Sequence, residues 1–257
     1  MKKTFMLLMA MVMVVMMAAG CGGGEKKKAE APKVLRVGTE PTFAPFEFQK
    51  DGSKEFDGFD MDLIRAIGKQ LNMKVEILNM GFDALIPALN AGNIDVAAAG
   101  MSITPDRQKA VDMSDPYYVA GLVVVVNKDN TAVKGINELN NKGIAVQIGT
   151  TGAERAAKVP GAKVKNFNTN AEVFLELKNK GVEAVIIDKP VAEYFLATGG
   201  GKDYAKIVGD TMEAESYGLS LKKNSPLTKD INKALLDLKK NGEYDKIYAK
   251  WFGAVKK

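Results

Sequence analysis

Two side chains that enzymes often use are almost missing here: the chain has no histidine, and its only cysteine is Cys21. A Ser-His-Asp triad, a Cys-His pair and the usual histidine-containing zinc sites are therefore excluded. General acid or base catalysis by Asp, Glu, Lys or Tyr is still possible. The composition favours a binding protein over an enzyme, and we expect no metal and no cofactor.

Two segments carry groups that can bind a small anion. Arg107 follows Thr104-Pro-Asp, and its planar guanidinium can hold a carboxylate through two hydrogen bonds. Taken alone, an arginine in this position is more often a surface residue of a helix. Gly149-Thr-Thr-Gly152 lies between a predicted strand and a predicted helix. The N–H groups of a helix start favour an anion, and a threonine there can equally be an N-cap.

The elements that must position these residues follow from the hydrophobic pattern. Leu63, Ile64 and Ile67 share one face at helical spacing. Short apolar runs predict strands at residues 34–37, 74–78, 94–98, 122–126, 144–147, 163–167, 184–187 and 217–221. Helices are predicted at residues 59–71, 82–91, 171–180, 191–196, 227–240 and 244–251, with another starting at 153. Two successive series of strands and helices predict an α/β fold with two lobes, each with a mainly parallel sheet.

The first residues have the pattern of a secretory signal. An apolar segment, Phe5 to Ala19, follows two lysines and ends in small residues just before Cys21. This ending resembles a bacterial lipobox, which would make Cys21 the lipidated first residue of the mature chain. The alternative is a buried cysteine that packs as a small hydrophobe. We assign residues 1–20 to the signal and residues 21–32, rich in Gly, Lys and Glu, to a flexible tether.

The charge of the mature chain is ordinary. Residues 1–20 contain two lysines and no acids, so their removal lowers the formal charge from +5 to +3. The remaining lysines are scattered and form no basic stripe, so we expect no nucleic-acid partner. No apolar run after residue 20 reaches the ~18 residues of a membrane span.

Several segments, in this order along the chain, resemble one family of binding proteins. They are Gly38–Phe48, Gly58–Leu63, Phe82–Pro87, Ala99–Gln108, Ser114–Tyr118, Gly242–Tyr244, Ile247-Tyr248 and Lys250–Gly253. Together they resemble bacterial polar amino-acid binding proteins, the solute receptors of ABC importers, and are most similar to the glutamine-binding branch. The resemblance extends over residues 33–253.

The resemblance implies a type-2 periplasmic binding fold and a way of working. Residues 33–120 and 218–257 would form the first lobe, and residues 121–217 the second. Two crossings, near 118–123 and 215–219, would act as a hinge. The expected protein is a lipid-anchored monomer outside the cytoplasm that closes around an amino acid and delivers it to a membrane permease and ATPase.

It also implies the residues of the site. The ligand-binding positions are Glu40, Phe43, Phe82, Gly100, Ser102, Arg107, Gln147, Thr150, Thr151 and Asp188. By resemblance, Arg107 and the N–H near Thr151 hold the ligand carboxylate, and Asp188 takes the ammonium group. A buried zwitterion needs such partners, because burying its charges unpaired is costly.

The remaining positions would contact the rest of the ligand. Phe43 and Phe82 would enclose its aliphatic part, and Ser102 would offer a hydroxyl and an N–H. Glu40 would meet the side chain. Each also has a plain structural interpretation: core residues for the two phenylalanines, a turn residue for Ser102 or Asp188, and a solvated loop acid for Glu40.

Departures from the glutamine-binding pattern bear on specificity. Gln147 stands where that pattern has lysine, Ile187 where it has histidine, and Glu40 replaces the commoner aspartate. These changes make the pocket more negative, which admits arginine or lysine. We predict glutamine first, a basic amino acid second and another polar amino acid third.

Two other functions fit the same fold. A cyclohexadienyl or arogenate dehydratase needs a positioned acid, and Glu40 could supply it. A stand-alone amino-acid sensor would need a separate signalling partner. Activity on prephenate or arogenate would identify the enzyme, and neighbouring permease or kinase genes would separate the importer from the sensor.

Overall fold

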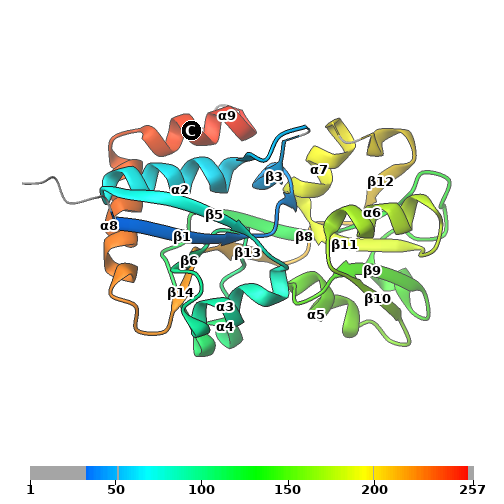
Figure 1. The fold of residues 1–257 in the computed structure, drawn as a ribbon. Coiled ribbons are helices and arrows are strands. Elements are labelled where there is room, and N and C mark those ends of the chain that lie inside the picture. Colours follow the sequence, from blue (N-terminus) through cyan, green and yellow to red (C-terminus); the bar gives the residue numbers. More distant parts are fainter. Residues whose placement is uncertain (1–32, 51, 199, 254–257) are drawn as a thin grey trace, which may run out of the picture. The chain divides into compact units, whose positions relative to one another are not determined.

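The computed structural model describes residues 33–50, 52–198 and 200–253 (Figure 1). The predicted signal and tether, including Cys21, lie outside the described residues. Within the described ranges, no helix is both long enough and apolar enough to span a membrane.

The strands and helices alternate along most of the chain. The strands are β1 (Lys33–Thr39), β2 (Thr42–Phe43), β3 (Glu47–Gln49), β4 (Phe56–Asp57), β5 (Met73–Asn79), β6 (Val96–Ala97), β7 (Val111–Met113), β8 (Tyr118–Asn127), β9 (Gly143–Gln147), β10 (Lys163–Phe167), β11 (Ala184–Asp188), β12 (Ala205–Val208), β13 (Ala214–Tyr217) and β14 (Ser220–Lys222). The α-helices are α2 (Phe59–Gln70), α3 (Leu85–Ala91), α4 (Pro105–Ala110), α5 (Thr151–Ala157), α6 (Asn170–Lys178), α7 (Lys189–Thr198), α8 (Leu227–Lys240) and α9 (Glu243–Phe252). Short 3-10 turns are η2 (Phe82–Ala84), η3 (Ile136–Leu139) and η4 (Gly201–Asp203).

The first lobe is built on a five-stranded sheet with the order β5-β1-β6-β14-β7. β1 pairs in parallel with both β5 and β6, and β14 pairs antiparallel with both β6 and β7. β14 is therefore the one strand of this sheet that runs against the others. Figure 1 shows α2 and α9 on one side of the sheet and α3 and α4 on the other, with α8 at the end of the sheet. Ile231 and Leu235 of α8 share a core with Leu63 of α2.

The second lobe repeats this plan with the strand order β10-β9-β11-β8-β12. β8 runs antiparallel to its neighbours β11 and β12, while β9 pairs in parallel with β10 and β11. Successive side chains of a strand point to opposite faces. Val123 and Val125 accordingly join the core with Phe174 of α6, and Val124 joins the core that contains Ala156 of α5. The predicted fold class is confirmed.

Two paired strands connect the lobes. The first part of β8 pairs antiparallel with β13, with Tyr118 opposite Tyr217, and its later part enters the second sheet. After β13, the chain returns to the first sheet as β14. The lobes touch closely enough that the chain from Lys33 onward forms one compact unit. The predicted division at residues 120 and 217 therefore stays a prediction.

The predicted single strand at residues 217–221 is wrong, because the strand is interrupted at Gly218 and Leu219, between β13 and β14. In this break, Gly218 N donates to Met101 O at 3.0 Å and Leu219 N donates to Ser114 Oγ at 2.9 Å. These bonds hold the break against the first lobe. The sequence pattern also missed the small sheet β2-β3-β4, whose strands are only two or three residues long.

Aromatic rings fill the space beside the connecting strands. Phe46 packs edge-on against Tyr118 and Tyr217, with ring centroids 4.9 and 5.1 Å apart, and Tyr118 stacks on Tyr217. Phe252 of the C-terminal helix lies 5.3 Å from Phe46. Such ring pairs contribute roughly 0.5–1.5 kcal/mol each beyond their buried area. They fix both connecting strands against the first lobe.

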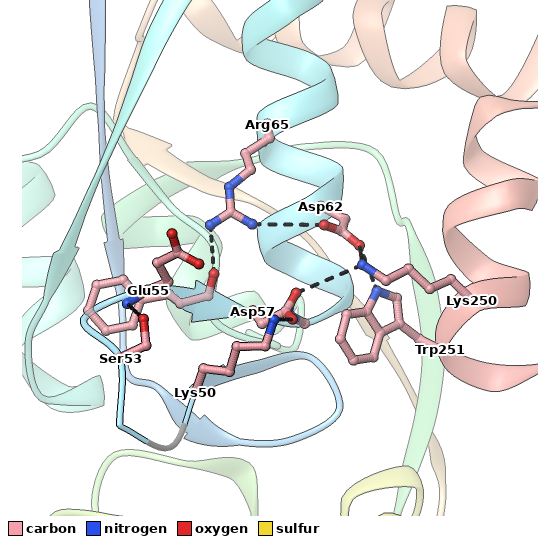
Figure 2. A network of polar contacts seen from close by, with 10 residues as sticks. Lys50, Ser53, Glu55, Asp57, Asp62, Arg65, Lys250 and Trp251 are labelled. Atoms are coloured by element: carbon pink, nitrogen blue, oxygen red, sulfur yellow. Dashed lines mark hydrogen bonds and ion pairs between the residues drawn. The ribbon is translucent and has the colours of Figure 1, made fainter.

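A polar network attaches α9 to the rest of the first lobe (Figure 2). Asp62 of α2 accepts hydrogen bonds from Lys250 Nζ at 2.7 Å and Trp251 Nε1 at 2.8 Å. Arg65, one turn further along α2, donates to Phe56 O at 2.6 Å. The network is half-exposed, so it directs the docking of α9 more than it stabilises the fold.

Candidate functional site

The ten residues that the resemblance predicts for the site all line one cavity between the lobes. Glu47 and Ala99 line it with them. Its free volume is about 20 Å³. That is room for about one water molecule, and an amino acid is several times larger. A solute of that size can enter only if the lobes or the lining side chains move apart.

One of the larger hollows is mostly apolar and offers less chemistry. An apolar groove of about 530 Å³ lies between the β2-β3 hairpin and helices α6 and α7, and its one charged lining residue is Lys178. Binding sites for small polar molecules need convergent polar groups at fixed positions. The small cavity has these groups, so we treat it as the candidate site.

Arg107 is held rigidly in the wall of the cavity. It lies on α4, whose N-cap Thr104 accepts a hydrogen bond from the Arg107 backbone N–H. Its Nη1 donates to Ser102 O at 2.8 Å and its Nη2 to Gly149 O at 2.9 Å, while the guanidinium lies 5.3 Å from the centre of the Phe82 ring. Burial lowers the pKa of Arg107, and nearby carboxylates, Asp188 among them, act to raise it.

Asp188 ends strand β11 and is buried. Burial raises its pKa to about 7, although the Tyr217 hydroxyl and Arg107 act to lower it. Within the described part of the chain, neither Asp188 Oδ1 nor the Tyr217 hydroxyl makes a hydrogen bond of normal geometry. Asp188 therefore has an oxygen available for a donor that enters the cavity.

Glu40 and Gln147 meet across the cavity from different lobes. Gln147 Nε2 donates to Glu40 Oε2 at 2.8 Å, and Gln147 Oε1 accepts from Asn170 Nδ2 at 3.0 Å. The Thr42 hydroxyl also lies within hydrogen-bond distance of Glu40, at 2.7 Å. Burial raises the pKa of Glu40, and the hydrogen bonds from Thr42 and Gln147 act to lower it.

Glu47 is a lining residue that the sequence reasoning missed. It begins β3, is 1% exposed, and its Oε2 has no hydrogen-bond partner among the described residues. Burial raises its pKa well above the usual range, and the negative charges of Asp60 and Glu40 raise it further. The available signal was an acid placed between Phe46 and Phe48, inside a segment that carried the resemblance.

Gly100 supports the aromatic wall. Its φ is +52°, and a Cβ there would come within 2.6 Å of the Phe43 ring. Its N–H donates to Asp60 Oδ2 at 2.9 Å, and the same oxygen accepts from the Tyr117 hydroxyl at 2.6 Å. Asp60 is fully buried, and burial raises its pKa to about 7.

The three hydroxyl residues of the predicted site differ in their partners. Thr150 is the N-cap of α5, since its Oγ1 accepts from Ala153 N, and its hydroxyl donates to Gln147 O at 2.7 Å. The hydroxyls of Ser102 and Thr151 both donate to Glu215, which the sequence reasoning also missed. No group of three or more Asp, Glu, His or Cys side chains within the described ranges could hold a metal ion.

The model of the bacterial extracellular solute-binding proteins, family 3, matches residues 35–254. The chain belongs to this family. The resemblance read from the sequence motifs is confirmed, and membership of an extracellular family places the folded chain outside the cytoplasm.

Individual relatives agree with the family. The probable histidine-binding protein of Neisseria gonorrhoeae is 34% identical over 86% of this chain and 83% of its own length. The arginine-binding extracellular protein ArtP of Bacillus subtilis is 33% identical over 87% of this chain and 88% of its own.

Solved structures show the same fold. An ancestral arginine-binding protein bound to arginine is 47% identical, has a TM-score of 0.83, and is matched over 87% of this chain and 100% of its own. An ancestral arginine-binding protein bound to glutamine is 46% identical, has a TM-score of 0.80, and is matched over the same shares.

The raised pKa of Asp60 predicts how stability depends on pH. In the fold Asp60 keeps its proton up to pH about 7, whereas in the unfolded chain it loses the proton near pH 4. Between these values the folded state binds more protons, so the free energy of unfolding falls as pH rises. We expect Asp60 to account for about 2 kcal/mol of this fall between pH 5 and 6.5.

Urea unfolding at both pH values would measure this slope. Asp60→Asn should reduce it, and the other acids whose pKa burial raises, Asp188, Glu47 and Glu40, should contribute to what remains. Asp245→Asn, at an exposed position on α9, should leave the slope unchanged. An equal slope in wild type and Asp60→Asn would contradict the expectation.

Proposed function

We propose that this protein captures a cationic L-amino acid between its lobes, with L-arginine as the first candidate. The composition of the cavity carries the proposal: Glu40, Glu47 and Asp188 line it, beside the single guanidinium of Arg107. A zwitterion brings one positive and one negative charge, so it leaves the excess of acids unchanged. A cationic side chain reduces that excess.

The ligand backbone fits the two charged residues best. Arg107 would hold the α-carboxylate, in place of the carbonyl oxygen of Gly149 to which its Nη2 now donates. Asp188 would accept from the α-ammonium group through the oxygen that has no partner among the described residues. The relatives named for histidine and arginine share this family, which supports an amino acid as the solute.

The ligand side chain would extend toward Glu40 and Glu47. A guanidinium offers five donors in one plane and forms paired hydrogen bonds with carboxylates. Its positive charge would act to lower the pKa of Glu47, whereas burial and repulsion from the other acids raise it. Phe43 and Phe82 would cover the methylene groups between the two ends.

Glutamine, which the sequence motifs placed first, is the competing ligand. The solved ancestral arginine-binding protein bound to glutamine supports it, and the amides of Gln147 and Asn170 could hydrogen-bond a ligand amide. A neutral amide would leave Glu40 and Glu47 without a cation, so we place it second. The preference for glutamine stays a prediction.

Capture requires that both lobes contact the ligand. Arg107, Ser102, Phe43 and Glu40 belong to the first lobe, while Gln147, Thr151 and Asp188 belong to the second. The connecting strands β8 and β13 would form the hinge, and the ligand would favour the closed form through contacts that exist only there.

Binding without catalysis is part of this proposal. A dehydratase-like enzyme would need Glu40 as a proton donor or acceptor, and incubation with prephenate or arogenate tests that alternative. We also propose that Cys21 carries a lipid, that the monomer is tethered to the membrane, and that it delivers its solute to an ABC permease and ATPase.

The charge arrangement predicts different effects for different variants. Arg107→Ala and Asp188→Ala should weaken every amino acid ligand about thirtyfold or more, since removing one partner of a buried charge pair costs ~2–5 kcal/mol. Glu40→Gln and Glu47→Gln should weaken arginine at least tenfold and glutamine only slightly. Titration calorimetry against arginine, lysine and glutamine would measure this.

Glu76→Gln is the matched control, because Glu76 is an exposed acid on β5. It should change no affinity. Native-like affinity of folded Arg107→Ala for the ligand would contradict the placement of the site. Equal losses for arginine and glutamine in Glu47→Gln would contradict the cationic side chain.

The anchor predicts a separate phenotype. Cys21→Ser should move the protein from the membrane to the soluble fraction and leave its ligand affinity unchanged, since the site lies within the folded lobes. Cell fractionation with metabolic palmitate labelling would show this. A wild-type protein that takes up no label and stays in the soluble fraction would exclude the anchor.

A further inference from the structure

One carboxylate oxygen joins a residue of each lobe at the hinge. Glu215 lies on β13, and its Oε2 accepts from Ser102 Oγ at 2.6 Å and from Thr151 Oγ1 at 2.7 Å. Ser102 follows β6 of the first sheet, whereas Thr151 begins α5 of the second lobe. Both residues line the ligand cavity.

Backbone hydrogen bonds fix the positions of Glu215 and Ser102 relative to each other. Glu215 pairs with Ala120 across the two connecting strands. Ser102 forms an isolated antiparallel bridge with Tyr217, and Ile103 N donates to Ser216 O at 2.7 Å. The loop of Ser102 and the strand of Glu215 therefore move together.

Thr151 is held by the second lobe and not by these backbone bonds. Helix α5 packs on β9 and β11 of the second sheet, and the backbone bonds that fix Ser102 do not include it. The hydrogen bond from Thr151 to Glu215 thus joins the second lobe to strand β13 and to the Ser102 loop that is bonded to it. A hinge opening that carries α5 away from the first lobe would break this bond.

We propose that Glu215 is a latch that holds the closed form together and positions the Ser102 hydroxyl for the ligand. This inference rests on the proposed function, capture of an amino acid between the lobes. It adds a positioning residue to the ten predicted from sequence.

The positioning part follows from hydrogen-bond inventory. A hydroxyl has one proton and two lone pairs, and an ionised carboxylate only accepts. Since the protons of Ser102 and Thr151 both point to Glu215, the lone pairs of Ser102 Oγ are left for a donor. In the cavity that donor would be the ligand ammonium, shared with Asp188.

The size of the latch effect follows from its exposure. Glu215 and Thr151 also line an outer groove between the lobes, so water would replace their bond when the lobes separate. At the lower end of the usual energy range, one hydrogen bond to a charged group changes the affinity about tenfold. We expect an effect of this size, because water can replace the bond. The loss should occur mainly in the dissociation rate.

The experiment measures L-arginine binding by stopped-flow fluorescence and calorimetry in the full-length chain. Glu215→Ala should raise Kd and the dissociation rate about tenfold, and Glu215→Gln, which keeps an acceptor but not the charge, should fall between it and wild type. Thr151→Val should have a similar effect. The double variant Glu215→Ala with Thr151→Val should be little worse than either single variant.

Two further measurements keep the test specific. Glu213→Ala is the matched control: Glu213 is exposed, two residues away, and its side chain makes no hydrogen bond within the described part of the chain. Thermal unfolding must show that each variant is folded. If the alanine variant is not, the nearly isosteric Glu215→Gln decides.

The outcomes separate the two proposals. Wild-type arginine binding with an unchanged dissociation rate in folded Glu215→Ala and Glu215→Gln would overturn the latch alone. Fully additive losses in the double variant would also overturn it. A wild-type chain that binds no amino acid would overturn the proposed function, and the latch with it.

Discussion

An unbalanced set of buried charges is the constraint on which this structure depends. Among the described residues, the buried acids are the four carboxyl groups of Glu40, Glu47, Asp60 and Asp188. The one buried base among them is the guanidinium of Arg107. Burial of a charge without a partner is costly, and the fold meets that cost by raising the pKa of the acids and by hydrogen bonds from backbone and hydroxyl groups. The part of this cost that the fold does not offset would be reduced by a ligand that brings positive charge.

The fold brings these groups together by connecting two sheets through the paired strands β8 and β13. Asp188 ends a strand of the second sheet, Arg107 and Gly100 follow a strand of the first, and the hairpin of β2 and β3 contributes Phe43 and Glu47. The connecting strands β8 and β13 run between them. The hydrogen bonds of Arg107 with Gly149 and of Gln147 with Glu40 tie the lobes across the cavity. Ligand contacts and lobe closure therefore involve the same side chains.

Much of this could be predicted from the sequence, because strong periodicity and recognisable motifs carry it. The long apolar strands and amphipathic helices follow their patterns, and the ten motif residues converge on one cavity. Glu47 and Glu215 could not be found this way. Each lies on a strand of three or four residues, where the partners of a side chain come from distant segments and not from a local pattern. The break between β13 and β14 was missed for the same reason, since hydrogen bonds from its backbone N–H groups to Met101 O and Ser114 Oγ hold it.

The most direct test of the account compares two ligands that differ in charge and hardly in shape. L-Citrulline has the length of L-arginine but carries a neutral ureido group in place of the guanidinium. If the buried acids require a cation, calorimetry on the wild-type protein should show arginine binding at least about thirtyfold more tightly than citrulline, as for a charge left unpaired in a buried site. Equal affinities for the two would contradict the account, because the excess of carboxyl groups would then play no part in choosing the ligand.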